Sequence, residues 1–222
     1  MPRNIADVFR SLGMQEIEKV IYEKIAEGED VYAILKECQD EMAKVGERFE
    51  SGEFYLAELI ISAKMFEKVA GILSPKIKER GSEAIESIGT IVLGTPKGDV
   101  HNLGKNIFAI MAKSAGFEVL DLGVDVPAQK FIEAALQVGP KIIGMSGLLT
   151  LVYPSMKEVV DLLKEQGLRD RVKVIIGGGA TGEEARRYVG ADAQTLDAAE
   201  GVRICKKLID PSTAGGGAYD GN

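Results

Sequence analysis

A short segment of this 222-residue chain holds the residues best suited to carry chemistry. Asp99 and His101 stand two positions apart, and Gly98 and Gly104 beside them free the backbone. A carboxylate at this spacing can accept a hydrogen bond from one imidazole nitrogen, which fixes the tautomer and leaves the other nitrogen as a base or metal ligand. For an isolated Asp-x-His pattern a simpler interpretation is favoured, in which His101 caps the next helix and Asp99 is a turn residue.

The residue counts limit the metal chemistry that is open to the chain. His101 is the one histidine of the sequence, which excludes a zinc site built on several imidazoles. Cys38 and Cys205 lie far apart, so they suggest no disulfide framework, and they have no metal-ligand spacing with His101. Any metal chemistry here therefore uses at most one protein imidazole.

Charge and hydropathy exclude several classes of partner. The 27 Lys and Arg residues against 34 Asp and Glu give a net charge of -7, which is unfavourable for binding phosphate backbones. The first residues have no apolar core of the signal-peptide type. The longest apolar stretch, 142–153, is shorter than the roughly 18 residues that a membrane span needs. We expect a cytoplasmic protein with no nucleic-acid or membrane partner.

From Gly89 onward, short apolar runs alternate with amphipathic stretches, and this pattern indicates strands alternating with helices. Ser155 with Glu158, and Thr181 with Glu184, form capping boxes that would open two of these helices. Five strand-helix units predict a doubly wound five-stranded parallel sheet, an α/β Rossmann-like (flavodoxin-like) domain over 89–210. Strands are predicted at 90–93, 117–122, 141–145, 172–176 and 193–196, and helices at 103–115, 127–138, 155–167, 181–188 and 198–209.

The first third of the chain is predicted to be helical. Apolar residues recur at helical spacing, Asp30 is a candidate helix cap, and Gly52 marks a break between two helices. Short connections between such helices favour an antiparallel four-helix bundle. We therefore expect a helical domain over 1–88, which includes a linker at 74–89, and a flexible tail at 211–222.

Two further loops are expected beyond the carboxyl ends of the strands, where doubly wound sheets bind ligands. Ser146 to Thr150 follow the third strand, and Gly177 to Gly179 follow the fourth. A capped strand end and a loose turn are the simpler interpretations of these loops. No G-x-G-x-x-G follows the first strand, which disfavours a dinucleotide site, and Leu148 breaks the G-x-S-x-G pattern of a nucleophile elbow.

Together these loops resemble a known family. Asp99-x-His101-x-x-Gly104 resembles the B12-binding signature of proteins whose histidine binds the cobalt of cobalamin, and the wider stretch 94–106 is similar to that of methionine synthase and the methyltransferase corrinoid proteins. Ser146-x-Leu148 and Gly178-Gly179 fall at the second and third signatures of the family. Segments 45–49 and 52–56 resemble the helical cap that precedes its B12 domain. The resemblance covers about residues 10–209.

The resemblance implies a cofactor, cobalamin, and a set of residues around it. His101 would be the lower axial ligand of cobalt, with its ring held by Asp99. The cofactor's own base would leave cobalt and enter a channel between the loops, while Phe49 and Leu56 of the cap would cover the upper face. The cofactor-binding residues expected on this basis are Asp99, Val100, His101, Asn102, Gly104, Ser146, Leu148, Thr150, Gly177, Gly178, Gly179, Phe49 and Leu56.

One departure from the family pattern concerns proton transfer. In methionine synthase a hydroxyl residue stands two positions after the threonine that matches Thr150, and Val152 occupies that place here. The departure leaves open whether a proton relay continues beyond Asp99.

The function implied by the resemblance is that of a corrinoid carrier protein. It would accept a methyl group on Co(I) from a substrate methyltransferase and pass it to a second methyltransferase, toward tetrahydrofolate, without being a catalyst alone. Its partners would be these two enzymes and a reductive activase. Methanol, methylamines and aromatic methyl ethers are all open as methyl donors.

Two alternatives differ in function class. The cobalamin-binding subunit of an adenosylcobalamin mutase shares the Asp-x-His-x-x-Gly signature but generally lacks the helical cap. A B12-dependent regulator shares cap and B12 domain but adds a DNA-binding helix-turn-helix, for which the roughly 15 residues before the first expected cap helix give no room.

Overall fold

The computed structural model describes residues 4–79 and 87–210 of the chain. It divides into two compact units, one of Met1–Ser87 with Ile110–Gly116 and the other of Ile88–Ala109 with Phe117–Asn222. In the part of the chain that the structure describes, no helix is long and apolar enough to cross a membrane.

Helices form the first unit, as the apolar periodicity predicts. The carboxylate of Asp30 accepts a hydrogen bond from the backbone N–H of Ala33 at 3.3 Å, which confirms it as the cap of the third helix. Gly52 adopts φ +76° and ends that helix, as predicted. The apolar faces are buried, for example Ile17 and Ile34 at 0% exposure. The helices are α1 (Ile5–Arg10), α2 (Glu16–Ala26), α3 (Val31–Glu50) and α4 (Leu56–Glu79).

Two features of this unit differ from the expectation. The short helix α1 was not predicted, because its six residues span less than two turns and give too little periodicity. Helix α4 continues through Pro75 to Glu79, so the first part of the expected linker is helical, because Leu73 and Ile77 extend the buried face by one turn. The rest of the linker, 80–86, and the expected tail, 211–222, lie outside the described residues.

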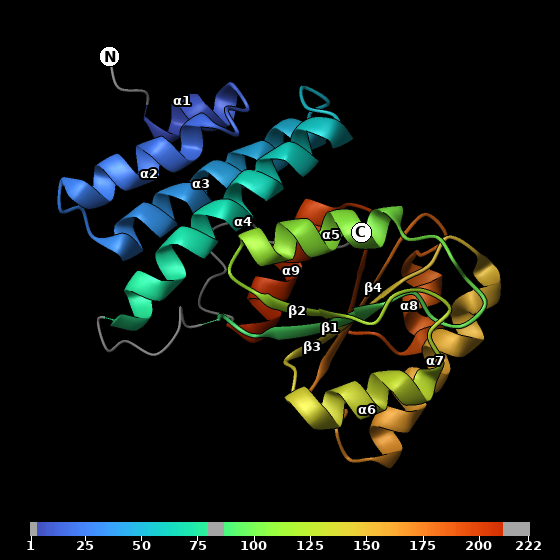
Figure 1. Cartoon of the computed structure of the whole chain (residues 1–222). Coiled ribbons are helices and arrows are strands. Elements are labelled where there is room, and N and C mark those ends of the chain that lie inside the picture. The colour runs from blue at the N-terminus through green and yellow to red at the C-terminus, as the bar shows by residue number, and fades with distance from the viewer. Residues whose placement is uncertain (1–3, 80–86, 211–222) are drawn as a thin grey trace. The chain divides into compact units, whose positions relative to one another are not determined.

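The second unit contains a five-stranded sheet in the order β2-β1-β3-β4-β5, in which every neighbouring pair is parallel (Figure 1). This confirms the flavodoxin-like doubly wound fold. The strands are β1 (Thr90–Gly94), β2 (Glu118–Asp121), β3 (Ile142–Ser146), β4 (Lys173–Gly177) and β5 (Ala193–Thr195). The helices are α5 (Leu103–Ser114), α6 (Ala128–Val138), α7 (Tyr153–Glu165), α8 (Glu183–Val189) and α9 (Ala198–Ile209), with a 3₁₀ turn η1 (Thr150–Val152).

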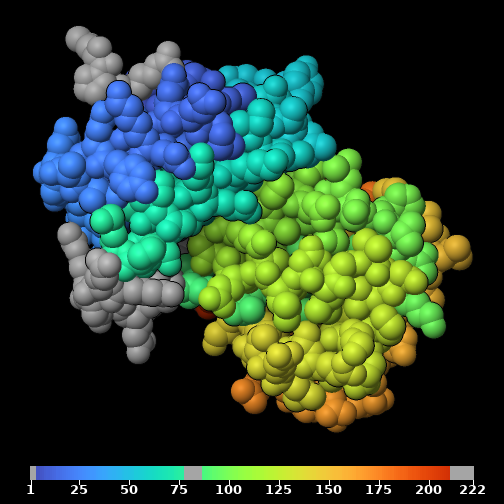
Figure 2. Space-filling view, in the orientation of Figure 1, coloured from blue at the N-terminus to red at the C-terminus, as the bar shows by residue number. Residues whose placement is uncertain are grey.

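Helices cover both faces of this sheet. Buried residues of α6, α7 and α8 pack with Val92, Ile143 and Val174 on one face. Helices α5 and α9 lie over the other face (Figure 1), where the ring of Phe108 stands against Gly201. In the space-filling view, the segment from β2 to α6 makes up much of the visible surface of this unit (Figure 2). The strand order reverses between β1 and β3, so the loops after these two strands flank the point where such sheets bind ligands.

The two predicted capping boxes are wrong. Helix α7 begins at Tyr153, with Pro154 in its first turn, so Ser155 lies inside the helix. Helix α8 begins at Glu183 after Gly182. The hydroxyl group of Thr181 instead donates a hydrogen bond to the carbonyl of Gly178 at 2.9 Å and so stabilises the loop before the helix.

Candidate functional site

The carboxylate of Asp99 joins the loops that follow β1 and β3. The Asp99 side chain is buried, with the residue 1% exposed. Its Oδ2 accepts hydrogen bonds from the backbone N–H groups of Leu148 at 2.7 Å and Leu149 at 3.3 Å. Its Oδ1 accepts one from the backbone N–H of His101 at 2.8 Å and lies 2.6 Å from Nδ1 of the His101 ring. A single side chain therefore fixes both the imidazole and the neighbouring loop.

These hydrogen bonds also determine the ionisation of Asp99. Burial disfavours the charged carboxylate and by itself would raise its pKa, but the hydrogen bonds from His101, Leu148 and Leu149 outweigh burial and leave the pKa lowered. An ionised Asp99 accepts a hydrogen bond from Nδ1–H of His101, which makes Nε2 the nitrogen with a free lone pair.

The His101 ring stands at the edge of the sheet with its side chain 49% exposed. The hydroxyl group of Thr95, a fully buried residue, donates a hydrogen bond to the backbone carbonyl of His101 at 3.1 Å. Within the described chain the Nε2 atom has no hydrogen-bond partner, and no three His, Cys, Asp or Glu side chains gather into a metal-ion site. His101 is thus a single, pre-oriented nitrogen donor that can occupy one coordination position of a metal ion held in a cofactor.

Val152 is not part of a relay from Asp99. Its side chain is fully buried in the apolar core, where it packs among buried residues such as Met156. In the described chain, the hydrogen bonds of the Asp99 carboxylate come from His101 and two backbone N–H groups and none comes from a hydroxyl group. The network that starts at His101 therefore ends on the backbone of the loop after β3.

The loops after β3 and β4 are in direct backbone contact. Gly147 donates a hydrogen bond from its N–H to the carbonyl of Gly177 at 2.9 Å. Gly178 has φ +101°, and a Cβ atom there would lie 2.5 Å from the carbonyl oxygen of Gly147. A Cβ atom on Gly147 would lie 2.7 Å from side-chain carbons of Val152 and Met156. Glycine is therefore required at both positions.

Small residues line the face of the sheet toward α9. Ser146, Gly177 and Thr195 stand side by side in the register of β3, β4 and β5, so they share this face. A Cβ atom on Gly177 would lie 3.1 Å from the Thr195 carbonyl oxygen, and one on Gly201 would lie 3.1 Å from the Phe108 ring. The sequence analysis expected Ser146 and Gly177 in the loops, whereas they are the last residues of β3 and β4. No motif singles out Thr195, Phe108 and Gly201, which lie on the same side of the sheet.

The loops after β1 and β3, which include His101, expose several apolar side chains. Val100 is 67% exposed and Leu148 is 48% exposed, and Leu103 and Leu151 are also exposed. The other expected site residues at this edge, Asn102, Gly104, Thr150 and Gly179, are exposed as well. A Cβ atom on Gly104 would meet no atom within 4 Å, so the space beside the first turn of α5 is open. The two loops therefore expose apolar side chains together with one imidazole nitrogen donor.

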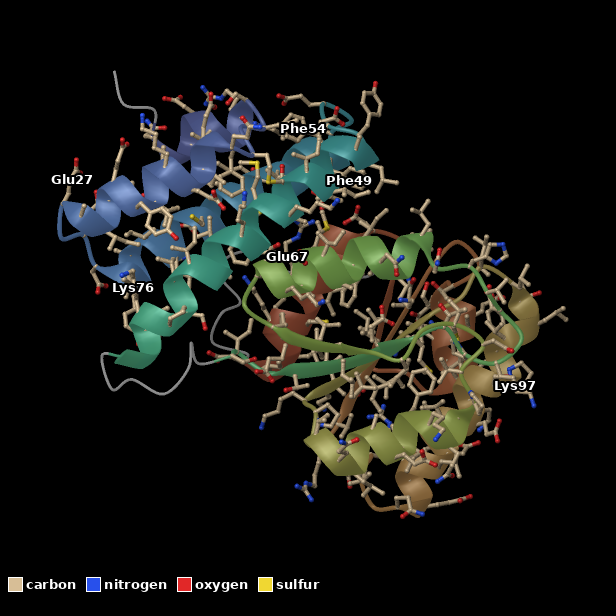
Figure 3. The ribbon with its side chains drawn as sticks, in the orientation of Figure 1. Glu27, Phe49, Phe54, Glu67, Lys76 and Lys97 are labelled. Atoms are coloured by element: carbon tan, nitrogen blue, oxygen red, sulfur yellow. The ribbon has the colours of Figure 1, made fainter. Side chains whose placement is uncertain are left out.

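Phe49 lies at the end of α3 in the helical unit (Figure 3), and Leu56 lies at the start of α4. Both residues are half-buried. The turn between them is held by the N–H of Phe54, which donates a hydrogen bond to the Arg48 carbonyl at 2.9 Å. The Arg48 guanidinium stands 5.2 Å from the centre of the Phe54 ring. Arg48 therefore helps to shape this turn.

Neither thiol of the chain is placed to act as a ligand. Cys38 on α3 and Cys205 on α9 are buried, and burial raises the pKa of each thiol to about 12.

Comparison with known proteins identifies the family. Residues 89–203 match the model of the B12 binding domain, and residues 5–74 match a second model also described as a B12 binding domain. A dimethylamine corrinoid protein of Methanosarcina mazei is 42% identical over 76% of this chain and 99% of its own length. The chain belongs to the methyltransferase corrinoid proteins.

Solved structures agree with this assignment. A cobalamin-binding protein from Desulfitobacterium hafniense is 40% identical, with a TM-score of 0.75 over 91% of this chain and 96% of that one. The methanol:cobalamin methyltransferase complex of Methanosarcina barkeri matches with a TM-score of 0.81 and 25% identity, over 92% of this chain and 78% of the matched chain. The cofactor of this corrinoid protein is cobalamin, as predicted.

The residues at the carboxyl edge of the sheet fit that cofactor. His101 presents one free imidazole nitrogen on an apolar surface, as a planar macrocycle with a central metal requires. The glycine backbones of the loops after β3 and β4 provide close approach without side chains.

Proposed function

We propose that this corrinoid protein carries a methyl group between two methyltransferases, and that the group comes from a methylamine. Support for the donor class comes from the dimethylamine corrinoid protein, which matches over nearly its whole length. Tetrahydrofolate as the final acceptor and a reductive activase as a third partner belong to the same proposal. We also propose a cap domain at 1–88 and a cobalamin-binding domain at 89–210.

The observation that carries the proposal is the Asp99–His101 pair. Nδ1 of His101 lies 2.6 Å from an Asp99 oxygen that burial and backbone N–H groups hold in place. Nε2 is then free to bind cobalt from below, and the carboxylate makes that nitrogen a stronger donor. Cobalamin, when bound, supplies the metal centre on which the methyl group travels.

The remaining residues of the site bind and orient. Val100, Asn102, Leu148 and Thr150 would face the underside of the macrocycle from the two loops that Asp99 joins. Gly104 leaves space beside α5. Ser146 and the loop Gly177, Gly178 and Gly179 would line the channel for the cofactor's own base. Phe49 and Leu56 would cover the upper face from the cap.

Replacing Asp99 with asparagine should shift the Co(II)/Co(I) midpoint potential of the bound corrinoid to less negative values. A neutral amide makes the imidazole a weaker donor, so the oxidised state is stabilised less. Spectroelectrochemical titration measures the potential. Asp161→Asn is the control, because that carboxylate forms only exposed ion pairs with Lys157 and Lys164. An unchanged potential in Asp99→Asn would contradict a tuning role.

The donor is tested by supplying the reduced protein with methylamine, dimethylamine, trimethylamine, methanol and an aromatic methyl ether, each with its cognate methyltransferase. We expect methylation, followed by the change in the corrinoid absorption spectrum, with a methylamine enzyme. Methylation with the methanol or ether enzyme alone would refute the methylamine assignment and leave the carrier function intact.

A further inference from the structure

Asp125, in the loop between β2 and α6, has an unusual backbone conformation. Its φ is +53°, and within the described chain Leu12 is the other non-glycine residue with positive φ. Aspartate tolerates this left-handed region better than most residues, but glycine adopts it more readily still. An aspartate in this conformation indicates that its side chain contributes something that glycine would not.

The hydrogen bonds of Asp125 explain what it contributes. Its Oδ1 accepts a hydrogen bond from the backbone N–H of Gly98 at 2.8 Å. Its own backbone N–H donates to the carbonyl of Asp99 at 2.9 Å. Asp125 therefore holds the backbone on both sides of Asp99. The left-handed turn allows the N–H and the carboxylate of one residue to reach the same segment.

The segment around Asp125 continues this pairing. Lys97 donates from its N–H to the Val126 carbonyl at 2.9 Å, and Val126 donates to the Thr95 carbonyl at 3.0 Å. Pro96 and Val126 form an isolated parallel bridge. The loop after β1 thus lies along residues 123–126 as a short extension of the β1–β2 pairing. Asp125 stands at the end of this extension, where the backbone of the loop after β1 turns at Gly98 with φ +95°.

We propose that Asp125 is a positioning residue for the cobalt ligand. By holding the Gly98 N–H and the Asp99 carbonyl, it places the Asp99 carboxylate, which in turn orients Nδ1 of His101 and aims Nε2. This inference rests on the proposed function, because it takes His101 as the ligand that is oriented.

The test uses the full chain with two substitutions at one position. Asp125→Gly keeps the left-handed backbone and removes the carboxylate, whereas Asp125→Asn keeps an acceptor oxygen and tolerates the same φ. Two measurements are made on each variant. In the cofactor-free protein, ¹⁵N shifts of the His101 ring report its tautomer, and hydrogen exchange reports protection of the Gly98 N–H. In the protein loaded with cob(II)alamin, the nitrogen splitting of the cobalt EPR signal reports the fraction of chains with histidine bound.

For Asp125→Gly we expect the Gly98 N–H to lose its protection from exchange and the His101 ring to populate both tautomers. The ratio of histidine-bound to histidine-free cobalt should fall roughly tenfold, because residues that hold a metal ligand in place typically contribute roughly 10- to 100-fold to metal binding. Asp125→Asn should stay within about twofold of wild type, because its amide oxygen can accept the same hydrogen bond. An unchanged tautomer and splitting in Asp125→Gly would overturn the proposal. Equal losses in both variants would also overturn it.

Cobalt ligation by His101 and the positioning role of Asp125 can be disproved separately. If wild type loaded with cob(II)alamin shows no histidine nitrogen splitting, the proposed cobalt ligation fails. The tautomer and exchange measurements on the cofactor-free protein still decide whether Asp125 positions the Asp99–His101 pair.

Discussion

Replacing His101 with alanine is expected to convert the bound corrinoid to a form without a lower nitrogen ligand. The chain has no second histidine to substitute, and the described site offers Nε2 of His101 as its one imidazole donor. The Co(III) absorption spectrum should shift to that of base-off cobalamin, and the nitrogen splitting of the Co(II) EPR signal should disappear. We expect corrinoid affinity to fall by at least about 10-fold.

Rescue by free imidazole separates ligation from folding. Added imidazole can occupy the space that the missing ring leaves and bind cobalt from below, so it should restore the six-coordinate spectrum of His101→Ala. Circular dichroism should be unchanged, because the His101 ring is half exposed and packs in no core. An alanine variant with the spectrum of wild type in the absence of imidazole would contradict the assignment of His101.

Replacing Gly178 with alanine is expected to break the contact between the loops after β3 and β4. A Cβ atom at this position would lie 2.5 Å from the Gly147 carbonyl oxygen, and the φ of +101° is unfavourable for any L side chain. The clash is with backbone, so rotation of a side chain cannot relieve it. We expect a loss of about 3 kcal/mol in the free energy of unfolding, together with loss of corrinoid binding.

Gly182→Ala is the matched control, because it lies four positions further on in the same connection. A Cβ atom there meets no atom within 4 Å, and the backbone is extended at φ -152°. Urea denaturation of both cofactor-free variants measures the stability difference, and titration with hydroxocobalamin measures binding. Equal stability and binding in the two variants would mean that the Gly147–Gly178 contact is not needed.

Binding loss in Gly178→Ala has a specific route through the site. Displacing Gly147 would move the next residue, Leu148, whose N–H donates to Asp99 at 2.7 Å. A substitution in the loop after β4 is thereby expected to disturb the imidazole in the loop after β1. The ¹⁵N shifts of the His101 ring should report this disturbance even in the absence of cofactor.

The sequence predicted the sheet well because its strands are buried. The core strands β1, β3 and β4 are nearly continuous apolar runs bounded by glycine or polar residues, so the pattern alone placed them within one or two residues. Helix starts were harder to place. Ser155 and Thr181 are residue types that often cap helices, but Pro154 and Gly182 decide where α7 and α8 begin. The capping-box pattern takes no account of these neighbouring residues.

Site residues that belong to a sequence signature could be predicted, whereas residues that reach the site only through tertiary packing could not. Asp99 and His101 lie two positions apart, so their pairing could be foreseen from local geometry. The contacts of Asp99 with Leu148 and of Asp125 with Gly98 join residues 49 and 27 positions apart. Such contacts depend on which strands are neighbours and on their exact register. The apolar periodicity of the sequence contains no information on either.

The burial of the two cysteines has a consequence under the proposed function, in which the protein would carry an electrophilic methyl group. Thiolates are the strongest nucleophiles among protein side chains, and a thiolate near an electrophilic methyl group can be alkylated by it. Cys38 and Cys205 are both buried, and their pKa values of about 12 keep them as thiols at neutral pH. With methyl transfer as proposed, this burial would keep the two sulfur atoms from competing with the intended acceptor, and the chain would be protected against methylating itself.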